Sequence, residues 1–256
     1  MLVQPRKEIS TLALLDLEVP GGILLPDGTW GINLAAARLN FLKGLKIQIP
    51  AWNNMSISDN CKLFLNTTMV AQYTLTEDIE VDKRVTLFVA PERLLSGNWE
   101  LSYQITRFGQ KPEPGPTIKI FVKLELPAGQ DTNPDYGHSE LTMAFDPPDV
   151  VRDGVDKNTV KQGVRIYAQP KPGDGWLYRN CAVGDVLILA WAGKTVESAP
   201  VTQIQLDDPE ANPIMVLADE ATILSAGDSD GVSVSYKIRD RVNNESEDWC
   251  EAVRIV

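Results

Sequence analysis

The sequence predicts an all-β protein made of two copies of one small domain, and two observations lead to this prediction. The chain repeats itself: the run from Asp59 to Val70 aligns without a gap with the run from Asp185 to Val196. Both halves also consist of short apolar runs separated by glycine, proline, asparagine and aspartate, which is the pattern of β-strands joined by turns. A self-similar unit of this size indicates a tandem repeat of a β domain.

Seven strands are predicted in each copy, which is the number found in an immunoglobulin-like β-sandwich. The strands expected in the first copy are Thr11–Val19, Gly44–Ile49, Cys61–Leu65, Ala71–Leu75, Val85–Ala90, Trp99–Thr106 and Thr117–Leu124. The strands expected in the second copy are Leu141–Phe145, Gly163–Gln169, Val186–Trp191, Val201–Leu206, Ile214–Ala218, Gly231–Ile238 and Cys250–Val256. Strict alternation from Trp99 to Ile105 places every second side chain on one face, where a sandwich core would cover it. The sequence therefore predicts two tandem immunoglobulin-like β-sandwich domains.

One segment has a composition that favours a helix, namely Leu34–Leu39, and Asn33 is suited to cap it. The corresponding region of the second copy, Val151–Gln162, contains Gly154 and has no apolar period. We interpret both segments as variable loops, with at most one helical turn in the first copy.

The domain boundaries follow from composition. We expect domain 1 at residues 1–127, a linker at residues 128–138 and domain 2 at residues 139–256, because the middle segment is polar and contains glycine and proline. A chain of 256 residues is long enough for two domains that each have a core.

The net charge of −11 is unevenly placed, since basic and acidic residues balance through Glu125 and the rest of the chain carries the excess. This acidity argues against partners such as a nucleic-acid backbone or an anionic membrane surface, both of which need clustered cations. A solubilising surface is the favoured interpretation, and binding of a cation or a basic partner is the alternative.

Location is left open by the sequence. No run approaches the ~20 apolar residues of a membrane span. The apolar run near the N-terminus is cut by Asp16 and Glu18, so no signal peptide is recognised. We therefore expect a cytoplasmic protein, a protein exported without a leader, or a component of a particle.

The second copy carries an ordered set of residues around its strands: Gly184 and Asp185, Trp191 and Gly193, Tyr236 and Asp240, then Asn244, Ser246 and Trp249. This order resembles the tandem immunoglobulin-like repeats of large bacterial surface proteins. The first copy departs from it, with Ser58 and Leu65 in the places of Gly184 and Trp191. The resemblance implies a stalk, a binding or adhesion unit, or a module of a phage particle.

Catalysis is not indicated. The single histidine, His138, lies in a segment where its neighbours Ser139 and Glu140 would diverge, so they cannot form a triad. The sequence has no nucleophile elbow, phosphate-binding glycine loop or metal motif. We expect a protein that is not an enzyme, and a hydrolase on a sandwich fold is the remote alternative.

A calcium site is the one cofactor that the sequence suggests. Asp131, Asn133 and Asp135 alternate in the expected linker, and such oxygen ligands suit Ca²⁺. The spacing is not that of an EF-hand, and the same residue types are common in turns. Turn chemistry is therefore the favoured interpretation, so no cofactor is expected unless Ca²⁺ binds here.

Binding residues are expected on loops that share one end of each sandwich. The candidates are Trp52, Asn53 and Asn54 in the first copy, and Trp176, Tyr178 and Trp249 in the second. Aromatic side chains on such loops are suited to anchor a protein or glycan surface. The equally weighted alternative is that each aromatic ring covers its own core.

The three cysteines cannot form a complete disulfide framework. Cys61 is in phase with core residues, so we expect it to be buried. A Cys181–Cys250 disulfide is conceivable, but two thiols are favoured.

The function predicted from the sequence is that of a non-catalytic binding or adhesion module. The alternative is a structural spacer, or a decoration or assembly component of a larger complex.

Overall fold

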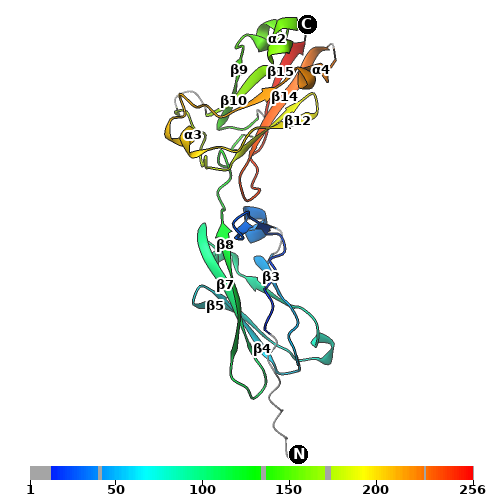
Figure 1. Cartoon of the computed structure of the whole chain (residues 1–256), viewed down its shortest axis with the longest axis vertical. Coiled ribbons are helices and arrows are strands. Elements are labelled where there is room, and N and C mark those ends of the chain that lie inside the picture. Colours follow the sequence, from blue (N-terminus) through cyan, green and yellow to red (C-terminus); the bar gives the residue numbers. More distant parts are fainter. Residues whose placement is uncertain (1–12, 40–41, 134–136, 171–173, 228, 256) are drawn as a thin grey trace, which may run out of the picture. The chain divides into compact units, whose positions relative to one another are not determined.

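The computed structural model describes residues 13–39, 42–133, 137–170, 174–227 and 229–255, and the chain divides into two compact units (Figure 1). Unit 1 is Met1–Leu124 and unit 2 is Glu125–Val256. Each unit has its own cluster of buried apolar side chains between two β-sheets. Each is therefore an immunoglobulin-like sandwich, which confirms the predicted fold class.

The described part of unit 1 contains one large sheet and one small sheet. The large sheet has the strand order β1-β2-β8-β7-β4-β5, and the small one pairs β3 with β6. The strands are β1 (Ile23–Leu24), β2 (Trp30–Ile32), β3 (Leu45–Ile49), β4 (Asn60–Leu65), β5 (Thr68–Thr74), β6 (Val85–Val89), β7 (Gly97–Thr106) and β8 (Glu113–Val122). Neighbouring strands are antiparallel except β2 and β8, which are parallel. The helical segments are η1 (Ala35–Leu39), η2 (Asp78–Glu80) and η3 (Pro91–Arg93).

Alternation along the strands fills the core of unit 1. Leu101, Tyr103 and Ile105 of β7 are at most 2% exposed, while the residues between them are half-buried. On β3, Ile47 and Ile49 are fully buried in the same cluster. The period of two therefore places one face of each strand in the core.

Unit 2 has the same plan. Its sheets have the orders β13-β10-β9 and β12-β11-β14-β15. The strands are β9 (Leu141–Asp146), β10 (Val164–Pro170), β11 (Val186–Trp191), β12 (Lys194–Glu197), β13 (Met215–Ala218), β14 (Ser229–Arg239) and β15 (Trp249–Ile255). The helices are α1 (Val150–Asp153), α2 (Lys157–Gln162), α3 (Gln203–Asp207) and α4 (Glu220–Leu224). In the described residues, no helix is long and apolar enough to cross a membrane.

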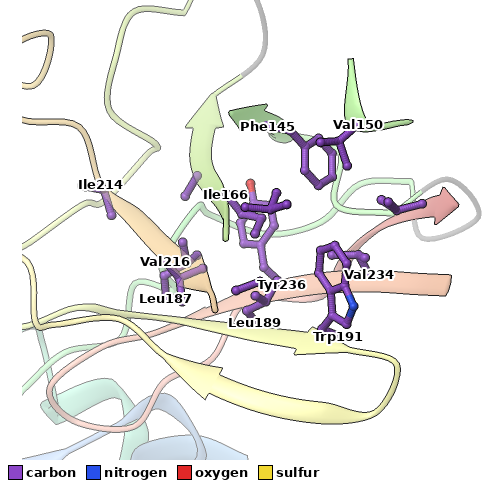
Figure 2. Close-up of a cluster of buried hydrophobic side chains, with 14 of the residues drawn as sticks. Phe145, Val150, Ile166, Leu187, Leu189, Trp191, Ile214, Val216, Val234 and Tyr236 are labelled. Carbon is purple, nitrogen blue, oxygen red and sulfur yellow. The ribbon is translucent and has the colours of Figure 1, made fainter. Parts of the chain in front are cut away.

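The core of unit 2 lies between these sheets. Figure 2 shows Ile166 and Val216 of one sheet facing Leu189, Trp191 and Tyr236 of the other. Trp191 and Tyr236 are among the largest fully buried side chains of the protein.

The repeat is visible in matching hydrogen bonds to backbone carbonyls. In unit 1 the Ser58 amide donates to the Leu75 carbonyl, and in unit 2 the Gly184 amide donates to the Val201 carbonyl, at 2.9 and 2.8 Å. The Tyr103 hydroxyl of unit 1 donates to the Leu15 carbonyl at 2.5 Å. The corresponding hydroxyl of unit 2 donates to the Thr142 carbonyl at 2.6 Å.

One predicted strand is wrong. Val201–Leu206 is largely occupied by α3, and the edge strand β12 lies earlier in the chain. The physical reason is a capping box, in which the side chains of Thr202 and Gln205 each accept a hydrogen bond from the other residue's backbone amide.

Other differences concern the segments that precede the core strands. The strand expected at Thr11–Val19 is reduced to a bridge between Glu18 and Gln48, and its first two residues lie outside the described residues. The region expected as a loop at Val151–Gln162 contains most of α1 and all of α2, because Asp156 caps α2 by accepting from two backbone amides. The helical turn expected in unit 1 is present as η1, and the Asn33 side chain accepts from the Ala36 amide at 2.8 Å.

Ala128 and His138, at the two ends of the segment expected as a linker, both contact unit 2. The Ala128 amide donates to the Arg179 carbonyl at 2.8 Å, and the Ala128 side chain is buried in the core of unit 2. His138 is fully buried, and its amide donates to the Asp248 carbonyl.

Candidate functional site

A buried aspartate organises the loop between β3 and β4 in unit 1. Asp59 is fully buried, and its Oδ2 accepts hydrogen bonds from the Trp52 indole at 3.0 Å and from the Ser56 amide at 3.1 Å. Its Oδ1 accepts from the Phe108 amide, which belongs to the loop between β7 and β8, at 3.1 Å. One carboxylate therefore fixes two loops, 50–59 and 107–112, which are called the apical loops below.

Arg107 forms a second link between the apical loops. Its guanidinium Nε and Nη2 donate to the Asn53 carbonyl at 3.3 and 3.2 Å, and its Nη1 pairs with Glu113. Arg107 is only 8% exposed, so this ion pair and these hydrogen bonds are shielded from water. A charge buried in this way needs its partners, which makes the link costly to break.

The apical loops present apolar side chains to solvent. Phe108 is 76% exposed although its amide donates to Asp59, and Ile57 is 39% exposed next to Ser56, whose amide also donates to Asp59. Asn53 and Asn54 are exposed on the same loop as Ile57, and Asn54 has a left-handed φ of 57° that suits a tight turn.

Unit 2 repeats the buried half of this arrangement. Asp185 accepts hydrogen bonds from the Tyr178 hydroxyl and the Ala182 amide, both at 3.0 Å, where Asp59 binds Trp52 and Ser56. Burial, followed by the charge of Asp185, raises the pKa of Tyr178 far above its ordinary value. The tyrosine is therefore a neutral donor that supports the loop from inside.

The exposed half of the arrangement differs between the units. Val183 is 44% exposed at the position that aligns with Ile57, so an exposed β-branched side chain recurs. At the position of Phe108, unit 2 has Arg241, which is exposed. The two units thus share a scaffold but present different chemistry at the second apical loop.

The structure separates the residues that the sequence proposed for binding. Trp52 is 5% exposed and Tyr178 is 2% exposed, and their polar atoms are held by buried aspartates, which favours the alternative that these two rings cover their own cores. Trp249 is partly buried against the core of unit 2, beside Gly137. Trp176 is 52% exposed.

Two exposed residues of the apical loops, Phe108 and Ile57, were not predicted from the sequence. The available signal for Phe108 was an aromatic residue next to a glycine, between two strands whose alternation had already ended. Ile57 had no signal, because its exposure depends on the path of the loop around Asp59.

The residues proposed for Ca²⁺ show turn chemistry where they are described. The Asp131 Oδ1 accepts from the amides of Asn133 and Ser139, at 2.9 and 3.0 Å, and these bonds lower the pKa of Asp131. Asp135 lies outside the described residues. No group of three or more potential metal ligands occurs in the described ranges. The Ca²⁺ site therefore stays a prediction.

The structure also places the single histidine and the three cysteines. The His138 Nδ1 accepts from the Glu140 amide at 3.1 Å, inside unit 2. Cys61 is buried, as expected, and no disulfide joins Cys181 to Cys250.

Comparisons with known proteins find distant structural likeness only. No family model and no curated protein sequence matches the chain. The chain is similar to the fibronectin(III)-like modules of Clostridium thermocellum CbhA, with 11% identity, 94% of each chain covered and a TM-score of 0.47. It is also similar to a structure of a 1.5-MDa bacterial ice-binding adhesin, with 14% identity, 96% of this chain and 66% of that chain covered, and a TM-score of 0.31. A tetra-tandem repeat in the extending region of a large adhesion protein matches with 12% identity, 93% and 48% coverage and a TM-score of 0.28.

Proposed function

We propose that this chain is a non-catalytic binding module that contacts a partner protein through the apical loops of unit 1. The observation that carries the proposal is the 76% exposure of Phe108 on a loop whose backbone is held by a buried carboxylate. An aromatic ring fixed in this way loses little conformational entropy when a partner covers it.

The surroundings of Phe108 suit a protein contact. Ile57 adds apolar area, while Asn53 and Asn54 supply amide groups at the rim. Interfaces commonly combine an aromatic anchor with polar groups that exclude water around it. Arg107 and Asp59 are positioning residues, because they hold the loops and are themselves covered.

The test is binding of the labelled full chain to protein and glycan arrays. Phe108→Ser is expected to abolish wild-type signals on protein spots, because it removes the anchor without altering the backbone hydrogen bond to Asp59. Leu24→Ser is the matched control, since Leu24 is 64% exposed on β1, and it is expected to retain the signals.

Asp59→Ala separates positioning from contact. This variant keeps the Phe108 side chain but removes the acceptor of four hydrogen bonds that hold the apical loops, so binding is expected to weaken. Protein signals that persist in Phe108→Ser, or glycan signals only, contradict the proposal.

A structural spacer or assembly component is the second candidate. The observation in its favour is that Ile57 and Val183 occupy aligned positions and are both exposed, so each unit offers a similar apolar contact. Light scattering of the full chain tests this candidate: a defined oligomer that dissociates in Ile57→Ser and Val183→Ser supports it, and a monomer excludes it.

A further inference from the structure

The edge strand β13 of unit 2 is apolar on both of its faces. Val216 of this strand and Ile214, just before it, lie in the core of unit 2, as Figure 2 shows. Met215 and Leu217 alternate with them on the opposite face of the sheet and are 40% and 41% exposed. A continuous apolar run is typical of a strand that is covered on both faces, whereas the outer face of β13 is open to solvent.

The outer face beside β13 is also largely apolar. Tyr167 of β10 is the register partner of Met215, and Ala144 of β9 is the register partner of Tyr167. Arg165, which lies opposite Leu217, forms an ion pair with Asp146 at 3.0 Å. A strand added beside β13 would therefore extend a face that is apolar and locally neutral.

The free edge of β13 carries backbone groups without a strand partner. The sheet order β13-β10-β9 gives β13 a neighbour on one side only. The Ala168 amide donates to the Ile214 carbonyl at 3.2 Å, and in an antiparallel pair every second residue is bonded across the strands in this way. The amides and carbonyls of Met215 and Leu217 therefore point away from β10. Among the described residues they have no other partner, so they offer two donors and two acceptors.

The edge of the other sheet of unit 2 is protected, and the edge of β13 is not. The strand β12 has the exposed charged residues Lys194 and Glu197 at its two ends. Charged side chains on an edge strand oppose its pairing with another strand. No charged residue occurs within β13. Its edge is therefore open to strand addition, in which an extended segment of a partner continues the sheet.

Acidic side chains stand at both ends of β13. They are Asp207, Asp208 and Glu210 before the strand, and Asp219 and Glu220 after it, and all five are exposed. Within the described residues none of the five forms an ion pair. A partner segment along this edge would thus meet negative charge on either side of the apolar strand.

This charge distribution favours a basic partner over a second copy of the chain. In an antiparallel pair of two β13 strands, the acidic start of one strand would meet the acidic end of the other, and like charges there repel. Hydrogen bonds from Thr222, and after them the charge of Lys194, lower the pKa of Asp219, so this carboxylate stays ionised. Basic residues at the ends of a partner segment would instead be attracted.

We propose that β13 binds, by strand addition, an extended segment of a partner protein whose alternating apolar residues are flanked by basic residues. The backbone of the segment bonds to the outward groups of Met215 and Leu217, and its apolar side chains pack beside theirs on the outer face. Its basic ends face the carboxylates. The site lies on unit 2 and uses no residue of the apical loops of unit 1, so it takes its partner independently of them.

The test is amide hydrogen exchange, measured by NMR on the full chain with a set of synthetic peptides. Each peptide has about nine residues, within the usual length of a strand, with two lysines at each end. Between them, threonine alternates with valine, isoleucine, leucine or phenylalanine. At least one peptide is expected to slow exchange of the Met215 and Leu217 amides, while the Val216 amide, which faces β10, serves as the internal reference.

Peptides with glutamate in place of lysine are expected to bind about tenfold more weakly, because they face like charge. The proposal is overturned if no lysine-flanked peptide protects the two amides at about 1 mM, or if the glutamate-flanked peptides bind equally well.

Proline variants test the backbone contact. Leu217→Pro removes an amide that points to the free edge and costs no bond to β10, so it is expected to weaken peptide binding about tenfold. Leu217→Ala keeps this amide and is expected to weaken binding less. Thr195→Pro is the matched control on the edge of β12, because the Ser198 amide donates to the Leu187 carbonyl and the Thr195 amide therefore also points outward. Equal peptide affinity in the two proline variants would contradict the site.

Three further measurements separate the alternatives. A lysine-flanked peptide with methylated central amides is expected to lose binding to the wild type, which keeps the test valid if Leu217→Pro lowers stability. Glu210→Gln combined with Glu220→Gln is expected to reduce the salt dependence of binding, and an unchanged dependence would contradict the role of charge. A dimer that dissociates in Leu217→Pro, seen by light scattering, would identify a second copy as the occupant and overturn the proposal. Phe108→Ser should leave peptide binding unchanged, so this proposal and the apical-loop contact fail separately.

Discussion

Two titratable side chains in the core of unit 1 link its stability to pH. Burial raises the pKa of the Cys61 thiol to about 12. Burial, with the nearby charge of Cys61 as the next cause, raises the pKa of Tyr103 to about 12. Both groups are neutral in the folded state, so the unfolded chain loses their protons first as the pH rises.

Because the unfolded chain ionises at a lower pH than the folded protein, a rise in pH lowers the free energy of unfolding. The stability contribution of each group is present below its ordinary pKa, about 9 for the thiol and about 10 for the phenol, and is lost as the pH rises toward 12. We expect the free energy of unfolding of unit 1 to fall with a slope of up to about 1.4 kcal/mol per pH unit for each group. Cys61→Ala is expected to flatten the slope that begins near pH 9. Urea unfolding between about pH 7 and 11 measures it, and parallel pH profiles of the variant and the wild type would refute the assignment.

For the apical loops, the sequence predicts where the loop lies in the repeat but not which of its side chains point to solvent. The alignment of the two copies placed the matching loops of the two units, because Asp59 and Asp185 fall at the same place in the repeat. It did not reveal that Trp52 points inward, because that depends on a hydrogen bond to a carboxylate seven residues away. On the apical loops the exposed aromatic ring is therefore Phe108, while Trp52 is buried.

At the level of elements, the pairing of β7 with β8 contains an irregularity at Tyr103, where the ring packs over a glycine of the neighbouring strand. The register shifts between Ser102 and Gln104, and the ring of Tyr103 lies over Gly115. A Cβ atom at Gly115 would overlap this ring, whose hydroxyl binds the Leu15 carbonyl. A glycine covered by an aromatic ring on the neighbouring strand is a known way of fixing strand register.

Gly115→Ala is therefore expected to lower the free energy of unfolding of unit 1 by about 1–3 kcal/mol, because the ring must move from its packed position. Calorimetry of the full chain measures the change. Gly231→Ala is the control, since a Cβ atom there meets nothing within 4 Å. Equal melting temperatures for the two variants would show that the Tyr103 ring adapts without cost.

Long alternating strands were predictable and short elements were not. β4 and β7 were predicted to within two residues because their side chains alternate with a period of two, and β11 was predicted with its correct bounds because it is a continuous apolar run. The helices α1 and α2 have four and six residues, too few to show a helical period. For α3, the Thr202–Gln205 capping box was a local signal that outweighed the apolar run read as a strand.

At the scale of the whole molecule, the two buried clusters imply two separately stable units. Residues 1–124 and 125–256 are each expected to fold when expressed without the other, because no core residue of either cluster belongs to the other unit. Circular dichroism and a cooperative thermal melt of each fragment measure this. The boundary before Glu125 would be refuted if either fragment failed to fold while a fragment split after residue 127 succeeded.

The insertions before the second core strand differ between the units, with β2 beside β8 in unit 1 and α1 against β15 in unit 2. Adjacent copies of one fold are prone to exchange equivalent strands while a nascent chain is only partly folded. A terminal strand that joined the wrong copy would meet an unsuitable neighbour and leave an edge uncovered. The divergence of these two insertions is thus expected to protect the fidelity of co-translational folding, so that duplication of the architecture does not bring misassembly with it.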